Sequence, residues 1–220
     1  MAAAVPLILT GCAPTGPNLQ NSADGLFLGR TTVRQVIARY GQPSVHTTTS
    51  GAASQPTQAG RPGGLQHASV PGNIEVLRFS QTQVSTPLLL VGVVNTRGRS
   101  LALEFWNDRL IYYVFSSDFA ADSTNFNETT ISSLVRGQTT RADVIRDLGP
   151  PSGEGIYPYV AVQGTSMISY LYTELRSSGP VLVGGALSAR AKHAMFLFDA
   201  SDSLLDTYIS TLNVPSRSGR

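Results

Sequence analysis

The chain carries the same sequence motif twice, and this repeat restricts its fold more than any other feature. Residues 29–44 (GRTTVRQVIARYGQPS) align with residues 137–152 (GQTTRADVIRDLGPPS) at an offset of 108, and eight of the sixteen positions are identical. Average composition would give roughly one identity by chance. The sequence therefore predicts two copies of one structural unit.

Each copy has the start and stop signals of a short amphipathic helix. Thr32 with Gln35, and Thr140 with Asp143, have the spacing of a capping box. A glycine then suits the left-handed position after the helix, and a proline two residues later prevents continuation. These glycines are Gly41 and Gly149. We expect both helices to begin and end in the same way.

Short strands follow each helix, and the two copies align again there at an offset of 93. Strands are expected at 75–80, 100–106 and 110–115 in the first copy and at 168–173, 194–199 and 204–209 in the second. Strands joined by short polar turns pair antiparallel. The sequence therefore predicts an α+β fold of two tandem repeats, each with one or two short helices packed on a three-stranded antiparallel sheet. Residues 127–135 are the candidate for the extra helix in the second copy.

The change of offset from 108 to 93 implies that the first copy contains a 15-residue insertion. Residues 45–72 are rich in Thr, Ser, Gly, Ala, Gln and Pro and have no apolar periodicity. We expect a disordered surface loop there. The predicted organisation is thus the end of a signal peptide (1–11), an acylated tether (12–25), a first unit (26–118, including 45–72) and a second unit (119–215).

Cys12 is the only cysteine, which excludes an intramolecular disulfide and a zinc site with several thiolates. The string Leu9-Thr10-Gly11-Cys12 follows an apolar run and resembles the lipobox of bacterial lipoproteins. The resemblance implies cleavage before Cys12 and fatty-acyl chains, palmitate among them, on this residue. One acyl chain binds a membrane only marginally, so several chains make the attachment effectively permanent. In such lipoproteins an aspartate directly after the cysteine often keeps the protein in the inner membrane. Here that residue is Ala13, so the same resemblance favours the outer membrane.

The pattern Gly-x-Thr-Thr-x-x-x-Val-Ile-x-x-x-Gly-x-Pro, followed by strands and a polar turn, resembles the SmpA/OmlA (BamE-like) outer-membrane lipoproteins. It is also similar to the β-lactamase inhibitor protein, in which two such units lie in tandem. The first resemblance implies a non-catalytic, periplasm-facing scaffold for envelope or β-barrel assembly, with an envelope protein as its partner. Typical members of that family have one unit, whereas this chain has two. The second resemblance leaves open an inhibitor of a periplasmic or extracellular hydrolase.

Several other function classes find no support in the sequence. A net charge of +2, from 16 basic and 14 acidic residues spread along the chain, gives no concentrated field for nucleic acid. His46, His67 and His193 have no metal-ligand spacing and no nucleophile motif beside them. We therefore expect no metal, cofactor, small-molecule substrate or catalytic activity, although an enzyme without a recognisable motif stays open as a weaker alternative.

Two apolar segments, Leu88–Val94 and Val181–Leu187, each follow a proline and precede basic residues. They form ordinary buried strands, or they are exposed tips that meet a partner or lipid headgroups. The candidate contact residues are Leu88, Leu89, Leu90, Val91, Arg97, Arg99, Val181, Leu182, Val183, Arg190 and Lys192. The exposed faces and edges of the sheets are further candidates, together with Trp106, Tyr112, Tyr113 and Phe115, although aromatic residues on strands more often belong to a core.

Overall fold

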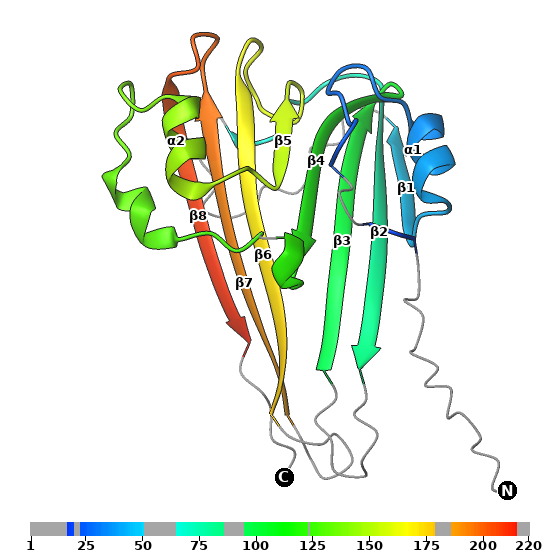
Figure 1. Cartoon of the computed structure of the whole chain (residues 1–220). Coiled ribbons are helices and arrows are strands. Elements are labelled where there is room, and N and C mark those ends of the chain that lie inside the picture. Colours follow the sequence, from blue (N-terminus) through cyan, green and yellow to red (C-terminus); the bar gives the residue numbers. More distant parts are fainter. Residues whose placement is uncertain are drawn as a thin grey trace, which may run out of the picture.

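The computed structural model describes residues 17–19, 23–50, 65–85, 95–122, 124–178 and 186–214. Two α-helices, α1 (Val33–Tyr40) and α2 (Arg141–Leu148), and two 3₁₀ helices, Ala120–Asp122 and Glu128–Ser133, lie around a sheet of eight strands (Figure 1). The strands are β1 (Val45–Ser50), β2 (Asn73–Ser85), β3 (Asn95–Trp106), β4 (Arg109–Ser117), β5 (Gly153–Ile156), β6 (Ser166–Ser178), β7 (Ala186–Phe198) and β8 (Leu204–Val214).

The prediction of an α+β fold with a separate three-stranded sheet in each unit is wrong. All eight strands form one antiparallel sheet in the order β1 to β8, and the described helices are short. The halves merge because β5 pairs with β4 on one side and with β6 on the other. Each half therefore contributes four strands. The first strand of each half, β1 or β5, was not predicted from the sequence.

Both helices begin and end as their sequences predict. The Thr32 hydroxyl accepts the Gln35 N–H at 3.3 Å, and the Thr140 hydroxyl accepts the Asp143 N–H at 3.2 Å. In return, each N-cap N–H donates to the side chain three residues later, at 2.9 Å in both helices. Gly41 has φ of +79°, a value that suits glycine, and Gly149 has +83°. The capping boxes are thus confirmed in both copies.

Each helix start is tied to the last strand of its own half. In the first half, the Gly29 N–H donates to the Leu110 carbonyl at 2.7 Å, and the Leu110 N–H donates to the Thr31 carbonyl at 2.9 Å. In the second half, Gly137, Leu204 and Thr139 make the same two bonds at 2.8 and 2.9 Å. Strands β4 and β8 are therefore counterparts, and β5 is the counterpart of β1.

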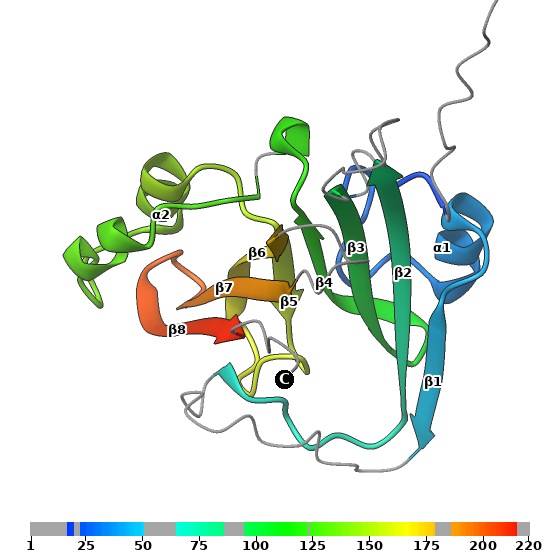
Figure 2. The ribbon, with the colours of Figure 1, turned by 90° about the horizontal axis from the view of Figure 1, so that it is seen from below.

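The sheet is buried on both faces near its centre. Both α-helices pack against the same face, since Tyr113 of the first core lies opposite Glu154, and Glu154 lies opposite Ile168 of the second core (Figure 2). The other face is covered by residues 65–72 and 157–163, including the buried side chains of Leu65 and Val160. Every residue of β4 after Arg109 is consequently buried.

The expectation of disorder over 45–72 is wrong at its start. Residues 45–50 form β1, which pairs antiparallel with β2, because threonine and valine suit strands even without an alternating apolar pattern. Residues 51–64 lie outside the described part of the chain. Residues 65–72 return along the sheet face with Leu65 and Val70 buried. The extra helix expected at 127–135 is the 3₁₀ helix Glu128–Ser133.

Candidate partner-binding surface

Many of the candidate contact residues lie outside the described part of the chain. These are Cys12, Leu88, Leu89, Leu90, Val91, Val181, Leu182 and Val183. The strand ends that flank the two apolar segments are described, however, and they occupy corresponding places in the two halves. Ser85 of β2 pairs with Asn95 of β3, and Ser178 of β6 pairs with Ala186 of β7.

Arg99 faces the interior of the chain. Its side chain is 11% exposed and forms an ion pair with Asp122 at 2.6 Å. The guanidinium also lies 4.1 Å from the centre of the Phe119 ring, and it donates to Gln81 at 3.3 Å. Arg97 is exposed, with its guanidinium 5.9 Å from the same ring. Because the charge of Arg99 is compensated within the chain, we leave this residue out of the contact surface proposed below.

Lys192, the counterpart of Arg99, is also turned inward. Only 5% of the residue is exposed, and its ammonium donates to the Phe126 carbonyl at 2.5 Å and to Glu128 at 2.7 Å. Glu128 also accepts from Arg190 at 2.9 Å. The hydrogen bond from Lys192 is the largest cause that lowers the pKa of the Glu128 carboxyl, and the charges of Lys192 and Arg190 add to it. Basic side chains of β3 and β7, the third strand of each half, thus bind acidic residues of the segment between β4 and α2, which links the two repeats.

The aromatic candidates on β4 belong to the core, as aromatic residues on strands more often do. Tyr112, Tyr113 and Phe115 are at most 9% exposed, and Tyr112 stacks on Tyr159 with 3.7 Å between ring centres. Trp106 is half-buried, and its indole N–H donates to the Pro71 carbonyl at 2.9 Å. Neither β4 nor Trp106 therefore offers a free aromatic surface.

His67 and Glu104 form a contact that sequence reasoning missed. Their Nε2 and Oε2 atoms lie 3.4 Å apart and mostly buried, beneath the 65–72 segment, and His67 lies edge-on to Tyr159 with 4.4 Å between ring centres. The two residues are 37 positions apart in the chain, so no local spacing could have brought them together. The pair joins the 65–72 segment to β3, and the cavity that the described residues form beside it holds only about 10 Å³.

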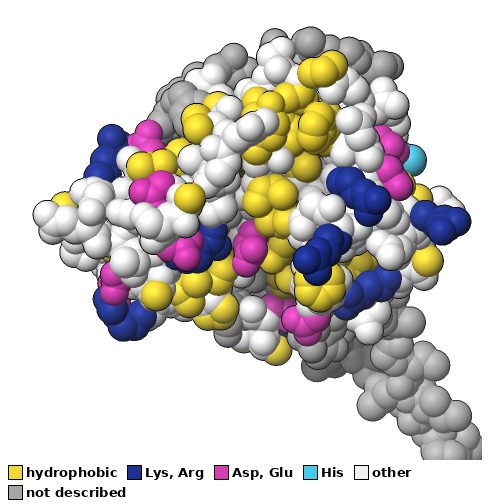
Figure 3. Space-filling view, turned by 90° about the horizontal axis from the view of Figure 1, so that it is seen from above, with side chains coloured by type: hydrophobic (Ala, Val, Ile, Leu, Met, Phe, Trp, Pro, Cys, Tyr) yellow, Lys and Arg dark blue, Asp and Glu magenta, His cyan; other side chains and the backbone are white. Residues whose placement is uncertain are grey.

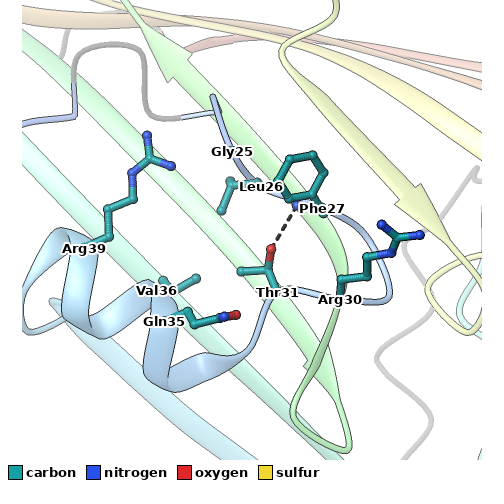
Figure 4. Close-up of a pocket in the computed structure, with 8 residues that line it drawn as sticks. All are labelled: Gly25, Leu26, Phe27, Arg30, Thr31, Gln35, Val36 and Arg39. Carbon is teal, nitrogen blue, oxygen red and sulfur yellow. Dashed lines mark hydrogen bonds between the residues drawn. The ribbon is translucent and has the colours of Figure 1, made fainter.

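A pocket of about 330 Å³ lies between α1 and the preceding segment (Figure 4). Its floor includes Leu26 and Val36, while Arg30 and Arg39 come from its two sides. Phe27 lines the same pocket and is 61% exposed. The apolar residues suit an apolar group of a partner, and the two arginines suit a negative charge next to that group. Sequence reasoning missed this pocket because Leu26 and Phe27, which complete it, lie before the repeated motif and carry no pattern of their own.

The second half presents an exposed apolar residue at the corresponding place. Val135 aligns with Phe27 at the offset of 108 and is 48% exposed. Both backbone N–H groups donate to a threonine hydroxyl four residues later, at 2.9 Å for Phe27 and 2.8 Å for Val135. Figure 3 views the molecule onto the end of the sheet that carries the β3–β4 and β7–β8 turns. Hydrophobic side chains gather on one part of this surface, and basic side chains lie near them.

The outer edge of β8 is the second exposed apolar region. It carries three exposed aliphatic side chains: Leu205 (41% exposed), Ile209 (50%) and Leu212 (58%). Strand β8 ends the sheet opposite β1, so its outer backbone groups face away from β7 (Figure 1). We refer to this strand edge, with Leu205, Ile209 and Leu212, as the β8 edge.

The described residues offer little for catalysis or a metal. Among them, no group of three or more histidine, cysteine, aspartate or glutamate side chains could hold a metal ion. Burial raises the pKa of Asp118, but its carboxylate already accepts the Gly98 N–H at 2.7 Å. Within the same residues, no helix has the length and apolar character to cross a membrane.

Ionised Asp143 is expected to stabilise the folded chain in a pH-dependent way. The Thr140 hydroxyl and N–H, assisted by Arg146, lower the pKa of Asp143 to about 2. An unfolded aspartate titrates near pH ~3.9, so this contribution is complete above about pH 4 and is lost as the pH falls towards 2. In urea unfolding, Asp143→Ala should therefore be less stable than the native chain at pH 7, with the difference shrinking towards pH 3.

Gln35→Ala is the matched control for Asp143→Ala, because Gln35 occupies the same position of the capping box in α1 and does not titrate. Its effect on the free energy of unfolding should not change between pH 7 and pH 3. An Asp143→Ala effect that is equally constant over this range would contradict the assigned role of its charge.

No protein-family model, curated protein or solved structure matches the chain.

Proposed function

We propose that the chain is an outer-membrane-anchored lipoprotein that faces the periplasm and acts as a non-catalytic protein–protein scaffold in envelope or β-barrel assembly. The observation that carries the proposal is the β8 edge, where exposed aliphatic side chains accompany a strand edge that no described segment covers. Exposed aliphatic side chains beside an unpaired strand edge are typical of protein interaction sites. The pocket beside α1, with exposed Phe27, supplies a second contact region.

The proposed anchor is Cys12, acylated within Leu9-Thr10-Gly11-Cys12. Each buried methylene group contributes about 0.8 kcal/mol, so several acyl chains hold a protein at a membrane without further lipid contacts. This arrangement does not require Arg99 or Lys192 to meet lipid headgroups, since both are paired inside the chain.

Palmitate labelling tests the anchor. Cells that express the full chain and are fed radiolabelled palmitate should incorporate label into the protein, and the Cys12→Ser variant should incorporate none, because it lacks the acceptor thiol. Fractionation should place the native protein with the outer membrane. Unlabelled native protein would refute the acylated anchor.

Whole-cell photo-crosslinking tests the scaffold. A photoreactive residue at Phe27 or Ile209, both at least half exposed, should form adducts with envelope proteins of the β-barrel assembly process, identified by mass spectrometry. The matched control is a photoreactive residue at Thr47, an exposed residue of β1 at the opposite edge of the sheet from β8. Saturating inhibition of a β-lactamase or cell-wall peptidase, with no assembly protein among the adducts, would favour the inhibitor instead.

A further inference from the structure

The β8 edge lacks the features that normally keep strand edges from pairing. Exposed edges are usually protected by lysine, proline or a bulge. Residues 204–214 contain no lysine, arginine or proline, and Asp206 is their one charged residue. The register shift between β7 and β8 lies at the start of the strand, so Asp206 to Val214 pair with β7 without interruption. Within the described part of the chain, no strand pairs with the outer side of this long, regular and almost uncharged edge.

The first half of the chain shows what an edge of this type can hold. Strand β4, the counterpart of β8, binds β5 along its outer edge in antiparallel register, with Tyr113 opposite Glu154. Leu110 corresponds to Leu204, since both make the same pair of bonds to the turn before their helix. Residues 206–208 of β8 thus correspond to residues 112–114 of β4, which are the residues that pair with β5.

We propose that the β8 edge binds an extended segment of a partner polypeptide, which adds to the sheet as an antiparallel strand. This inference rests on the proposed scaffold function and specifies the chemistry of the partner. Ile209 lies opposite Ala194 of the second core and so faces the helix side, whereas Leu212, three residues later, faces the other side. A matching segment is uncharged and presents β-branched or aromatic side chains on both faces. Strands of an unfolded β-sheet protein meet this description.

A second copy of the chain is a poorer occupant. Its free strand β1 is the counterpart of β5, but β5 fits against β4 through glycine. A Cβ atom on Gly153 would lie 2.3 Å from the Tyr113 carbonyl oxygen, and the residue of β1 at this place is Val45. Strand β1 also has Val45 as its one aliphatic residue, which leaves Ile209 and Leu212 without apolar partners. The β8 edge therefore favours a partner of different sequence.

Peptide titration of the full-length protein in detergent tests this inference. The probe is a fluorescent peptide with the sequence acetyl-Lys-Thr-Val-Thr-Ile-Thr-Val-Thr-Lys-amide. The double variant Ile209→Lys with Leu212→Lys places two charges on the edge, and we expect it to bind the peptide at least about tenfold more weakly than the native protein. Val45→Lys, at a comparably exposed apolar residue on β1, the opposite edge strand, should bind as the native protein does. Hydrogen exchange should slow in β8 when the peptide is present.

A second peptide separates strand addition from unspecific apolar contact. The same sequence with every backbone nitrogen methylated loses the donors on both of its edges, which a sheet ladder requires, and it should not bind. Equal binding of the two peptides, equal binding by the double variant, or no binding to the native protein would each overturn the proposal. Concentration-dependent self-association that disappears in the double variant would assign the β8 edge to a second copy, and would overturn it as well. Palmitate labelling and whole-cell crosslinking through Phe27 do not depend on this edge, so failure of the inference and failure of the proposed function give different results.

Discussion

Phe198→Ala is expected to lower the free energy of unfolding by about 3–5 kcal/mol, the range for removing a buried aromatic ring. The Phe198 side chain on β7 is fully buried in the second core, with the Arg141 guanidinium 5.2 Å from the ring centre. Phe105 on β3, its counterpart in the first half, is equally buried. The repeat therefore predicts a loss of similar size for Phe105→Ala.

Urea unfolding followed by circular dichroism measures both losses. Phe27→Ala serves as control, because this side chain is 61% exposed and its removal should change stability by less than about 0.5 kcal/mol. Since the two halves share one sheet, each core variant should shift a single unfolding transition. A change below about 1 kcal/mol for either core variant would contradict the two-core arrangement.

Gly153→Ala is expected to weaken the junction of the two halves, at a cost of about 3 kcal/mol. A Cβ atom at this position would lie 2.3 Å from the Tyr113 carbonyl oxygen and 2.8 Å from the Val114 Cα. Both of these are backbone atoms of β4, so no side-chain rotation can relieve the contact. The variant must therefore separate β5 from β4, and the halves should then unfold in two steps.

Gly98→Ala is the matched control for this variant. Gly98 also lies in a strand, but a Cβ atom there would meet its nearest neighbour, the Gln81 carbonyl oxygen, at an ordinary 3.6 Å. We expect this variant to keep the stability and the single transition of the native chain. Should Gly153→Ala and Gly98→Ala unfold alike, the close contact between β4 and β5 is not a stabilising junction.

The helices could be predicted from the sequence because their determinants are local. A capping box needs a threonine and an acceptor three residues later, and the stop needs one glycine. Thr32 and Gly41 therefore marked α1 without knowledge of the rest of the chain, and the repeat at Thr140 and Gly149 strengthened both predictions. The polar turns after β3 and β7 were equally local, and Asn107, Asp108 and Asp202 there have positive φ.

The single sheet could not be predicted in the same way. Strand β5 has only four residues, GEGI, and two of them are glycines, which are depleted in strands. Gly153 is explained only by the close approach of the β4 backbone, and Gly155 by the side chains of Tyr159 and Met167, which a Cβ atom there would meet at 3.0 and 3.1 Å. Strand β1 was missed for a related reason, since its sequence VHTTTS has no apolar alternation and its pairing with β2 spans the 51–64 segment.

The candidate site was only partly accessible from the sequence. The basic residues after the apolar segments were recognised, but nothing near Arg99 or Lys192 in the chain indicates that Asp122 and Glu128 compensate their charges. Sheet edges were predicted as contact surface, but the sequence did not indicate that β8 forms one, because exposure is a property of the assembled sheet. Ile209 reads as an ordinary strand residue until β8 is known to be the last strand.

The amide of Phe115 gives the most direct test of the claim that the two repeats form one sheet. This N–H belongs to β4 and donates to the carbonyl of Ser152, just before β5, at 2.8 Å, so its bond crosses the junction of the halves. Hydrogen exchange resolved by NMR should show the Phe115 amide exchanging as slowly as amides in the middle of β3 and β6. Exchange of this amide at the rate of an unprotected group, while β3 and β6 stay protected, would show that the repeats fold as two separate sheets.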